Sequence, residues 1–291
     1  MTAATNSTET SVRFAKTIVA LPPLPATAQE ILTCFGDEFI DAKNVARVVE
    51  GDPGICAKLL GLSNSAYFGL AEPVNDIGEA ISRVLGVDTV RSLVLAMAIQ
   101  QSFNSKGCPA FDVECFWQTS LMTAECCKKL ASLDALADDT ERDLAYSAGL
   151  CHNLGLMALT HIKPARTDRV LKAHKALDQH GSLAEMFEQE FETNHKIMTA
   201  ELGRIWSLPA PMVAAYQYRA FPKSHCDVRL AFVVAAGVTA VSNSQLDEDQ
   251  QLSLEPWCES LGISADDAQA MAILGKQQED RLLSLASNMT R

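Results

Sequence analysis

Two histidines and one asparagine are the residues of this sequence whose type and spacing could carry out chemistry. His152 and Asn153 are adjacent within residues 147–155, a segment that is otherwise almost entirely apolar, and His195 lies further along the chain. A buried imidazole or amide needs hydrogen-bond partners, and an imidazole can also bind a metal or transfer a proton. We therefore expect His152 and Asn153 to form either a satisfied polar pair in the core or part of a site.

Asn64, which lies between two serines, belongs to a second polar group of interest. It follows residues 55–62, whose apolar side chains recur at helical spacing behind Asp52 and Pro53, a pair typical of a helix start. Small polar side chains at a helix end can satisfy its last carbonyl groups. We expect Asn64 and Ser65 to end this helix, with contact to a ligand or partner as the alternative.

The elements that would position these residues are predicted to be helices throughout. Strand-like alternating runs are scarce and aromatic residues make up only 6% of the chain, so the predicted fold class is all-α. One long buried helix is predicted over residues 144–159, and a closing amphipathic helix over residues 265–286. The residues predicted to cap helices are Thr27 with Glu30, Asp41, Asp52, Asp76 with Glu79, Asp88, and Ser182 with Glu185.

A polar stretch containing glycine and proline at residues 104–109 is predicted to join two helical lobes. We expect residues 1–13 to form a loose tail and residues 14–107 to form the first lobe. The second lobe is predicted over residues 108–225, and residues 226–291 are predicted to be a C-terminal helical extension.

The composition is that of a globular chain with an acidic surface. The 291 residues are 48% hydrophobic and carry a formal net charge of −12. Proteins that bind nucleic acid duplexes normally have a basic surface, so nucleic acid is disfavoured as a partner. No apolar run reaches the ~20 residues of a membrane helix, and the first twenty residues carry no secretion signal. We expect a cytoplasmic protein with no membrane partner.

The nine cysteines do not form a pattern that indicates a site. They are scattered, odd in number and never spaced as Cys-x-x-Cys, so we expect reduced thiols rather than disulfides or a zinc site. The sequence also lacks Gly-x-Gly-x-x-Gly and His-Glu-x-x-His. The most familiar dinucleotide and zinc-protease motifs are therefore excluded.

Several ordered motifs resemble those of the HDOD family, the HD-related output domains of bacterial signalling proteins. They lie at residues 21–25, 52–69, 73–86 and 147–155, and the resemblance covers roughly residues 14–220. It implies a bilobed, all-helical fold related to the metal-dependent HD phosphohydrolases. It also implies a regulatory role, because members of the family commonly lack a complete metal site.

The resemblance allows the metal site to be compared position by position. HD phosphohydrolases hold a divalent metal through an early histidine, an adjacent His-Asp pair and a later aspartate. The pair corresponds to His152 and Asn153, the early ligand falls at or near Thr119, and the later one near Ala235 and Ala236. A hard divalent ion requires carboxylate or imidazole ligands that these residues do not supply. We expect no catalytic residue, no metal and no cofactor.

Two further positions match the family pattern. His195 corresponds to a histidine usual in the family, and Gln217-Tyr218 stands where some members carry two histidines. From its position we expect His195 to start a helix and to bond a neighbouring carbonyl group. The degenerate pocket is expected to contain Thr119, His152, Asn153 and His195, with Asn64, Ser65 and Tyr218 as candidate contacts for a ligand or partner.

The leading hypothesis is a non-catalytic signalling or interaction module that relays its state to a protein partner or a nucleotide second messenger. The alternative is a metal-dependent phosphohydrolase that acts on a nucleotide or phosphodiester, with His152 in an altered site. A third interpretation is a receptor that binds a nucleotide in the degenerate pocket without turnover.

Overall fold

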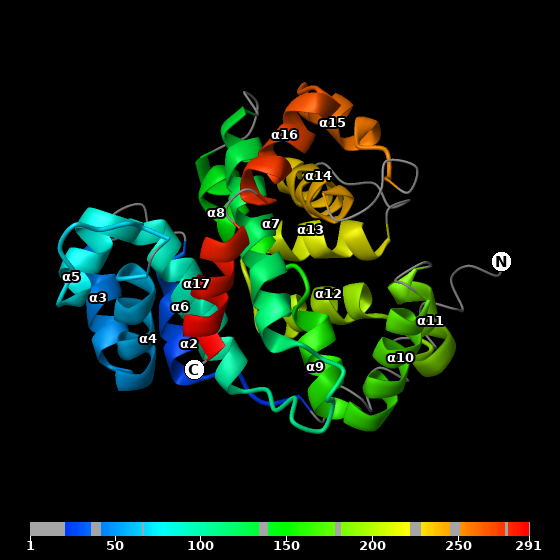
Figure 1. The fold of residues 1–291 in the computed structure, drawn as a ribbon, viewed down its shortest axis with the longest axis horizontal. Coiled ribbons are helices and arrows are strands. Elements are labelled where there is room, and N and C mark those ends of the chain that lie inside the picture. The colour runs from blue at the N-terminus through cyan, green and yellow to red at the C-terminus, as the bar shows by residue number, and fades with distance from the viewer. Residues whose placement is uncertain are drawn as a thin grey trace.

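The computed structural model describes residues 21–35, 42–65, 67–133, 139–177, 182–221, 228–244, 251–276 and 279–290. Within these ranges the chain forms helices and no strand, in a bilobed arrangement (Figure 1), so the predicted all-α class is confirmed. No helix in these ranges is both long enough and apolar enough to cross a membrane.

The first lobe surrounds one buried helix, α6. Its elements are α2 (Ala26–Thr33), α3 (Ala42–Glu50), α4 (Pro53–Ser63), α5 (Ile77–Glu79), the π-helical turn η1 (Ala80–Leu85) and α6 (Val87–Gln101). Helix α6 contacts α2, α3, α4 and η1, and its residues from Val90 to Ile99 are all buried. Gly86 ends η1 with φ 79°, a positive value that glycine adopts without steric cost.

The second lobe is arranged around the long helix α7. Its helices are α7 (Val113–Leu133), α8 (Asp139–Leu150), α9 (Leu154–Ile162), α10 (Pro164–Ala176), α11 (Leu183–Phe191), α12 (His195–Ile205) and α13 (Ala210–Ala220). Helix α8 packs along α7, and α12 packs on both α9 and α13. The break predicted at residues 104–109 falls between α6 and α7.

The last four helices are α14 (Arg229–Asn243), α15 (Glu255–Leu261), α16 (Ala265–Lys276) and α17 (Glu279–Thr290). Helix α14 packs on α7, α8 and α13, whereas α17, red in Figure 1, packs on both α7 and α4. The ammonium of Lys58 donates a 2.7 Å hydrogen bond to the carbonyl oxygen of Met289. The C-terminal helix therefore contacts both lobes.

The single closing helix predicted over residues 265–286 is wrong, because two helices occupy that stretch. Both helices pack on α7, but α16 also packs on α14 whereas α17 also packs on α4. Helix α15 was not predicted from the sequence. Its seven residues are too few to display a clear helical period.

Three of the predicted caps are confirmed. The carboxylate of Asp52 accepts from the amides of Gly54 and Ile55 at the start of α4. Asp76 accepts from the Glu79 amide, and Ser182 accepts from the Glu185 amide. Each pairing satisfies a backbone donor that has no partner inside its helix.

Two other caps were predicted wrongly, and one lies outside the described residues. Helix α2 starts one residue before Thr27, after Pro25, with no side-chain cap, and the Thr27 hydroxyl instead donates to Asp52 over 3.4 Å. Helix α6 starts after Gly86, so Asp88 lies in its first turn rather than at its cap. Asp41 is outside the described ranges.

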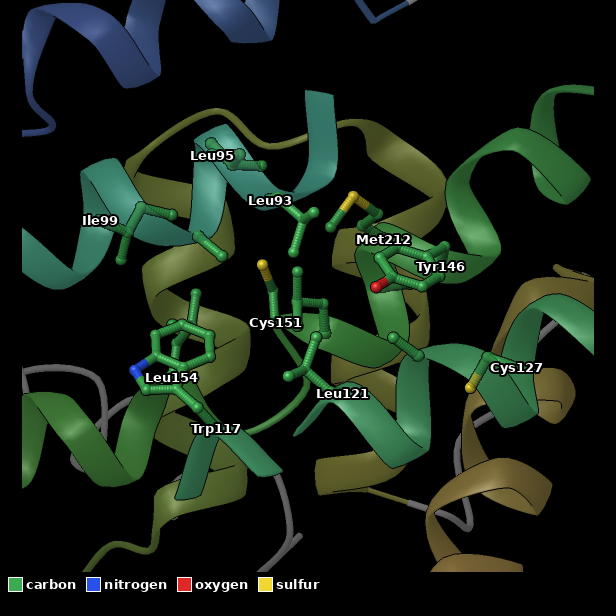
Figure 2. Close-up of a cluster of buried hydrophobic side chains, with 14 of the residues drawn as sticks. Leu93, Leu95, Ile99, Trp117, Leu121, Cys127, Tyr146, Cys151, Leu154 and Met212 are labelled. Carbon is green, nitrogen blue, oxygen red and sulfur yellow. The ribbon is translucent and has the colours of Figure 1, made fainter. Parts of the chain in front are cut away.

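One hydrophobic core extends through both lobes. Figure 2 shows Leu93 of α6 and Leu121 of α7 pointing toward Cys151, with Met212 of α13 close by. Trp117 of α7 is fully buried in the same cluster. The cysteines of the described ranges are all free thiols, as predicted.

Candidate functional site

The long helix predicted over residues 144–159 is broken at the two residues of chemical interest. Helix α8 ends at Leu150 and α9 begins at Leu154, with His152 and Asn153 in the turn between them. The side chain of His152 is buried there, at 4% exposure. The break places its imidazole at a junction between helices instead of on a helix face.

Directly after this break, α9 packs closely against α12. A Cβ atom on Gly155 would lie 2.0 Å from the carbonyl oxygen of His195 and 2.5 Å from the Thr199 nitrogen, so only glycine fits. The Gly155 amide donates to the Thr199 hydroxyl oxygen over 2.9 Å, and that hydroxyl donates to the His195 carbonyl over 2.9 Å. Thr199 thus joins the starts of α9 and α12 and brings His152 and His195 into one region.

The imidazole of His152 is held as a neutral ring. Its Nδ1 lies 2.7 Å from the carbonyl oxygen of Gly149, so Nδ1 carries the proton and donates. Burial, assisted by the positive charge of Arg219, lowers the pKa of His152 to about 3. At neutral pH this histidine carries no charge.

His195 is the first residue of α12, after Asn194, whose carboxamide oxygen accepts from two backbone amides of that helix. Its ring is 6% exposed and makes an edge contact with Phe187, with 5.7 Å between centroids. Within the described ranges its Nδ1 has no hydrogen-bond partner, so the expected carbonyl partner is not found. Burial, followed by the charge of Arg219, lowers the pKa of His195 well below its ordinary value.

Arg219 of α13 belongs to the candidate site but was not predicted from the sequence. Its guanidinium donates to the carbonyl oxygen of His152 over 2.5 Å. Burial lowers the pKa of Arg219 to about 10, which still leaves it protonated at neutral pH. A signal was present in the sequence, since Arg219 directly follows Tyr218 in a segment already recognised as part of the family pattern.

The other positions of the expected pocket offer no charged ligand. The carboxamide oxygen of Asn153 is buried without a hydrogen-bond partner among the described residues. Thr119 is half-buried on α7, and its carbonyl accepts from the Thr123 hydroxyl over 2.9 Å. In the described part of the chain, no hydrogen bond, ion pair or ring contact joins Thr119 to His152 or His195.

Small residues on α14 occupy the position of the later ligand. Ala235 and Ala236 are buried, and a Cβ atom on Gly237 would lie 2.6 Å from the sulfur of Cys127 on α7. Helices approach this closely only where side chains are small. Ala235 and Ala236 themselves supply no carboxylate or imidazole, and α14 packs closely on α7 at the next residue.

The remaining candidate contacts lie elsewhere. Asn64 caps the end of α4, and its amide group both donates to the Val74 carbonyl (2.9 Å) and accepts from the Val74 amide (2.8 Å). The Ser65 hydroxyl is buried without a partner in the described ranges. Tyr218 is half-buried, and its ring meets that of Phe232 edge-on with 5.3 Å between centroids.

The histidine pair does not fit a hard divalent ion. Among the described residues, no group of three or more His, Cys, Asp or Glu side chains is placed to hold a metal. Such an ion takes several oxygen ligands, including carboxylates. Here the pair of imidazoles is accompanied by the neutral Asn153 and the cationic Arg219. The guanidinium would repel a second cation.

Comparison with protein families and solved structures identifies similar chains. The model of the HDOD domain matches residues 21–222. A candidate signal transduction protein from Marinobacter aquaeolei VT8 is 23% identical with a TM-score of 0.79, covering 93% of this chain and 60% of its own. An HDOD domain protein of unknown function from Geobacter sulfurreducens is 18% identical with a TM-score of 0.72, covering 92% and 93%.

Two further proteins are similar to this chain. A candidate phosphohydrolase from Shewanella amazonensis SB2B is 23% identical with a TM-score of 0.72, covering 95% of this chain and 98% of its own. An uncharacterized protein of Treponema pallidum (strain Nichols) is 24% identical over 216 residues, which are 74% of this chain and 40% of that relative. The chain thus spans less than half of that curated protein, and identities at this level support the shared fold.

Proposed function

The chain belongs to the HDOD domain family, and from this premise we propose that it is a non-catalytic signal-transduction module with a degenerate HD-type pocket. In this proposal the domain relays its state to a protein partner or a nucleotide second messenger in the cytoplasm. The similarity of fold to a candidate signal transduction protein is consistent with that role.

The observation that carries the proposal is the position of Arg219. Its guanidinium donates to the His152 carbonyl and lowers the pKa of both buried imidazoles. In an HD-type enzyme the corresponding pocket would hold a metal cation, whereas here the positive charge is supplied by the protein itself. A pocket that contains a fixed cation, and in which no described carboxylate acts on the two imidazoles, is suited to structure or binding rather than to metal-assisted hydrolysis.

The alternative is a metal-dependent phosphohydrolase that acts on a nucleotide or phosphodiester. Its support is the pair of buried imidazoles on neighbouring elements, together with a fold similar to that of a candidate phosphohydrolase. For this alternative Arg219 would need to leave the pocket, so that a metal could bind His152 and His195. The buried polar atoms of Asn153 and His195 that lack partners would then acquire them.

Metal content and hydrolysis separate the two functions. The chain would be purified without a polyhistidine tag, analysed for metals by mass spectrometry, and assayed on nucleotide and phosphodiester substrates with Mn²⁺ or Mg²⁺. We expect no stoichiometric metal and no turnover above that of His152→Ala. His174→Ala, at a half-buried position of α10, is the matched control. Metal-dependent turnover in wild type and in His174→Ala that disappears in His152→Ala would establish the alternative.

A further inference from the structure

A cavity of about 160 Å³ lies between the two lobes and shares no lining residue with the histidine pair. Its apolar walls include Leu93 of α6, Leu121 of α7 and Leu285 of α17. An apolar cavity of about 150 Å³ can hold a benzene molecule. The cavity therefore has room for one small apolar group, and its lining comes from both lobes and from the C-terminal helix.

Tyr146 of α8 supplies a hydroxyl to this cavity. The residue is only 5% exposed, and no hydrogen bond joins its hydroxyl to another described residue. In Figure 2 the hydroxyl points toward the side of Leu93 and Leu121, two of the cavity residues. A phenol hydroxyl can both donate and accept a hydrogen bond. Burial raises the pKa of Tyr146, so the group remains protonated and can donate.

Two opposite charges border the same space. Glu125 and Lys128 lie one turn apart on α7, and neither forms an ion pair with any described residue. The Lys128 ammonium lies 5.8 Å from the centre of the Tyr146 ring. Glu125 is half-buried, and burial raises the pKa of its carboxyl. A carboxylate, an ammonium and a phenol thus border one cavity beside its apolar walls, and each has capacity for a further partner.

We propose that this inter-lobe cavity binds a small apolar zwitterion, of the class of an aliphatic α-amino acid. The ligand's ammonium pairs with Glu125, while its carboxylate accepts from Lys128 and from the Tyr146 hydroxyl. Its side chain fills the space among Leu93, Leu121 and Leu285. A ligand with one charge would pair either with Glu125 alone or with Lys128 and Tyr146 alone. The inference goes beyond the proposed function, because it assigns an input ligand to a separate site.

The position of α17 gives this site a means to affect the rest of the domain. Leu282 and Leu285 are 1% and 3% exposed and both line the cavity. The same helix is joined to α4 of the first lobe through the hydrogen bond from Lys58 to the Met289 carbonyl. A bound ligand would therefore contact both lobes and the C-terminal helix at once, and would stabilise their mutual packing.

The ligand class is tested with leucine and two analogues that each lack one charge. These are 4-methylpentanoate, without the ammonium, and 3-methylbutylamine, without the carboxylate. We expect leucine to raise the Tm of the full chain with increasing concentration and to bind in calorimetry. Each analogue should bind at least about tenfold more weakly. No leucine binding at millimolar concentration, or equal binding of either analogue, would overturn the proposal.

Variants assign the charges to residues. Glu125→Gln should weaken leucine about tenfold or more but leave 4-methylpentanoate unchanged, whereas Tyr146→Phe should weaken both. Glu259→Gln, an exposed position on α15, should bind leucine like wild type. Wild-type leucine affinity in either folded cavity variant would overturn the assignment. Hydrolytic activity, if found, would contradict the proposed function but not this site.

Discussion

The guanidinium of Arg219 donates a hydrogen bond to the carbonyl oxygen of His152 over 2.5 Å. This bond connects α13 to the turn between α8 and α9, so a positive charge is fixed beside the buried imidazole by a backbone acceptor. The same charge also lowers the pKa of His195. After burial, which is the larger cause, this one arginine lowers the pKa of both imidazoles.

Arg219→Met should raise the pKa of both His152 and His195. The substitution removes the cation that disfavours imidazolium, while burial continues to hold both pKa values below the ordinary value. The change can be followed by NMR titration of the imidazole resonances. Arg204→Met, an exposed residue of α12 that pairs with Glu201, is the control. Histidine pKa values that are the same in wild type and Arg219→Met would show that the guanidinium does not act on the rings.

The fold should lose stability as the pH falls from about 6.5 to about 3. The pKa of His152 is lowered to about 3 in the folded chain, whereas an unfolded histidine titrates near about 6.5. Between these values the unfolded chain binds the proton, so acid favours unfolding by up to about 1.4 kcal/mol per pH unit from this residue. Above about 6.5 the contribution is fully present.

The measurement is denaturant unfolding of wild type and His152→Gln as a function of pH. We expect the pH dependence to be less steep in His152→Gln. His174→Gln, on the half-buried face of α10, provides the comparison. If the unfolding free energy changed with pH equally in wild type and His152→Gln, burial of His152 would not lower its pKa as described.

Gly155→Ala should destabilise the domain by about 3 kcal/mol or more. The added Cβ would lie 2.0 Å from the His195 carbonyl oxygen, and backbone atoms cannot move aside without separating α9 from α12. Gly61→Ala is the matched control, because its Cβ meets nothing within 4 Å on an exposed face of α4. It should stabilise the chain by up to about 1 kcal/mol. Similar melting temperatures for the two variants would contradict the close approach of Gly155 to the His195 carbonyl oxygen.

Asn153→Asp should not create a metal site. Arg219 supplies a fixed positive charge, and Thr119, Ala235 and Ala236 leave the other ligand positions without a carboxylate or imidazole. We expect a loss of about 1 kcal/mol from desolvation of the new carboxylate. Thermal melting with and without Mn²⁺ tests this. A Mn²⁺-dependent rise in Tm that occurs only in the variant would show that the other ligands are present after all.

Asn64→Ala should cost about 1 to 2 kcal/mol, because two hydrogen bonds to Val74 are lost at the end of α4. Asn44→Ala removes a single contact with Arg47 on the exposed part of α3 and should change stability by less than about 0.5 kcal/mol. Urea unfolding of both variants gives the comparison. Equal urea midpoints would mean that the hydrogen bonds from Asn64 to Val74 do not stabilise the fold. A role of Asn64 as a ligand contact would then become the better explanation.

Local interactions made much of the fold predictable from the sequence. Asp52, Asp76 and Ser182 cap the helices that follow them, because each side chain bonds a backbone amide only two or three residues away. The helical period and the scarcity of alternating runs likewise predicted the all-α class. The motifs that resemble the HDOD family fall within the segment matched by the family model.

By itself, therefore, the sequence determined the helical class, three of the helix caps and the family, since these depend on neighbours along the chain. Only the tertiary structure showed that the helix over residues 144–159 breaks at His152, directly before the close contact of Gly155 with α12. It also showed that Arg219 meets the His152 carbonyl and that Tyr146 lines a cavity together with α17. These contacts join residues far apart in sequence, and no local propensity specifies such a pairing.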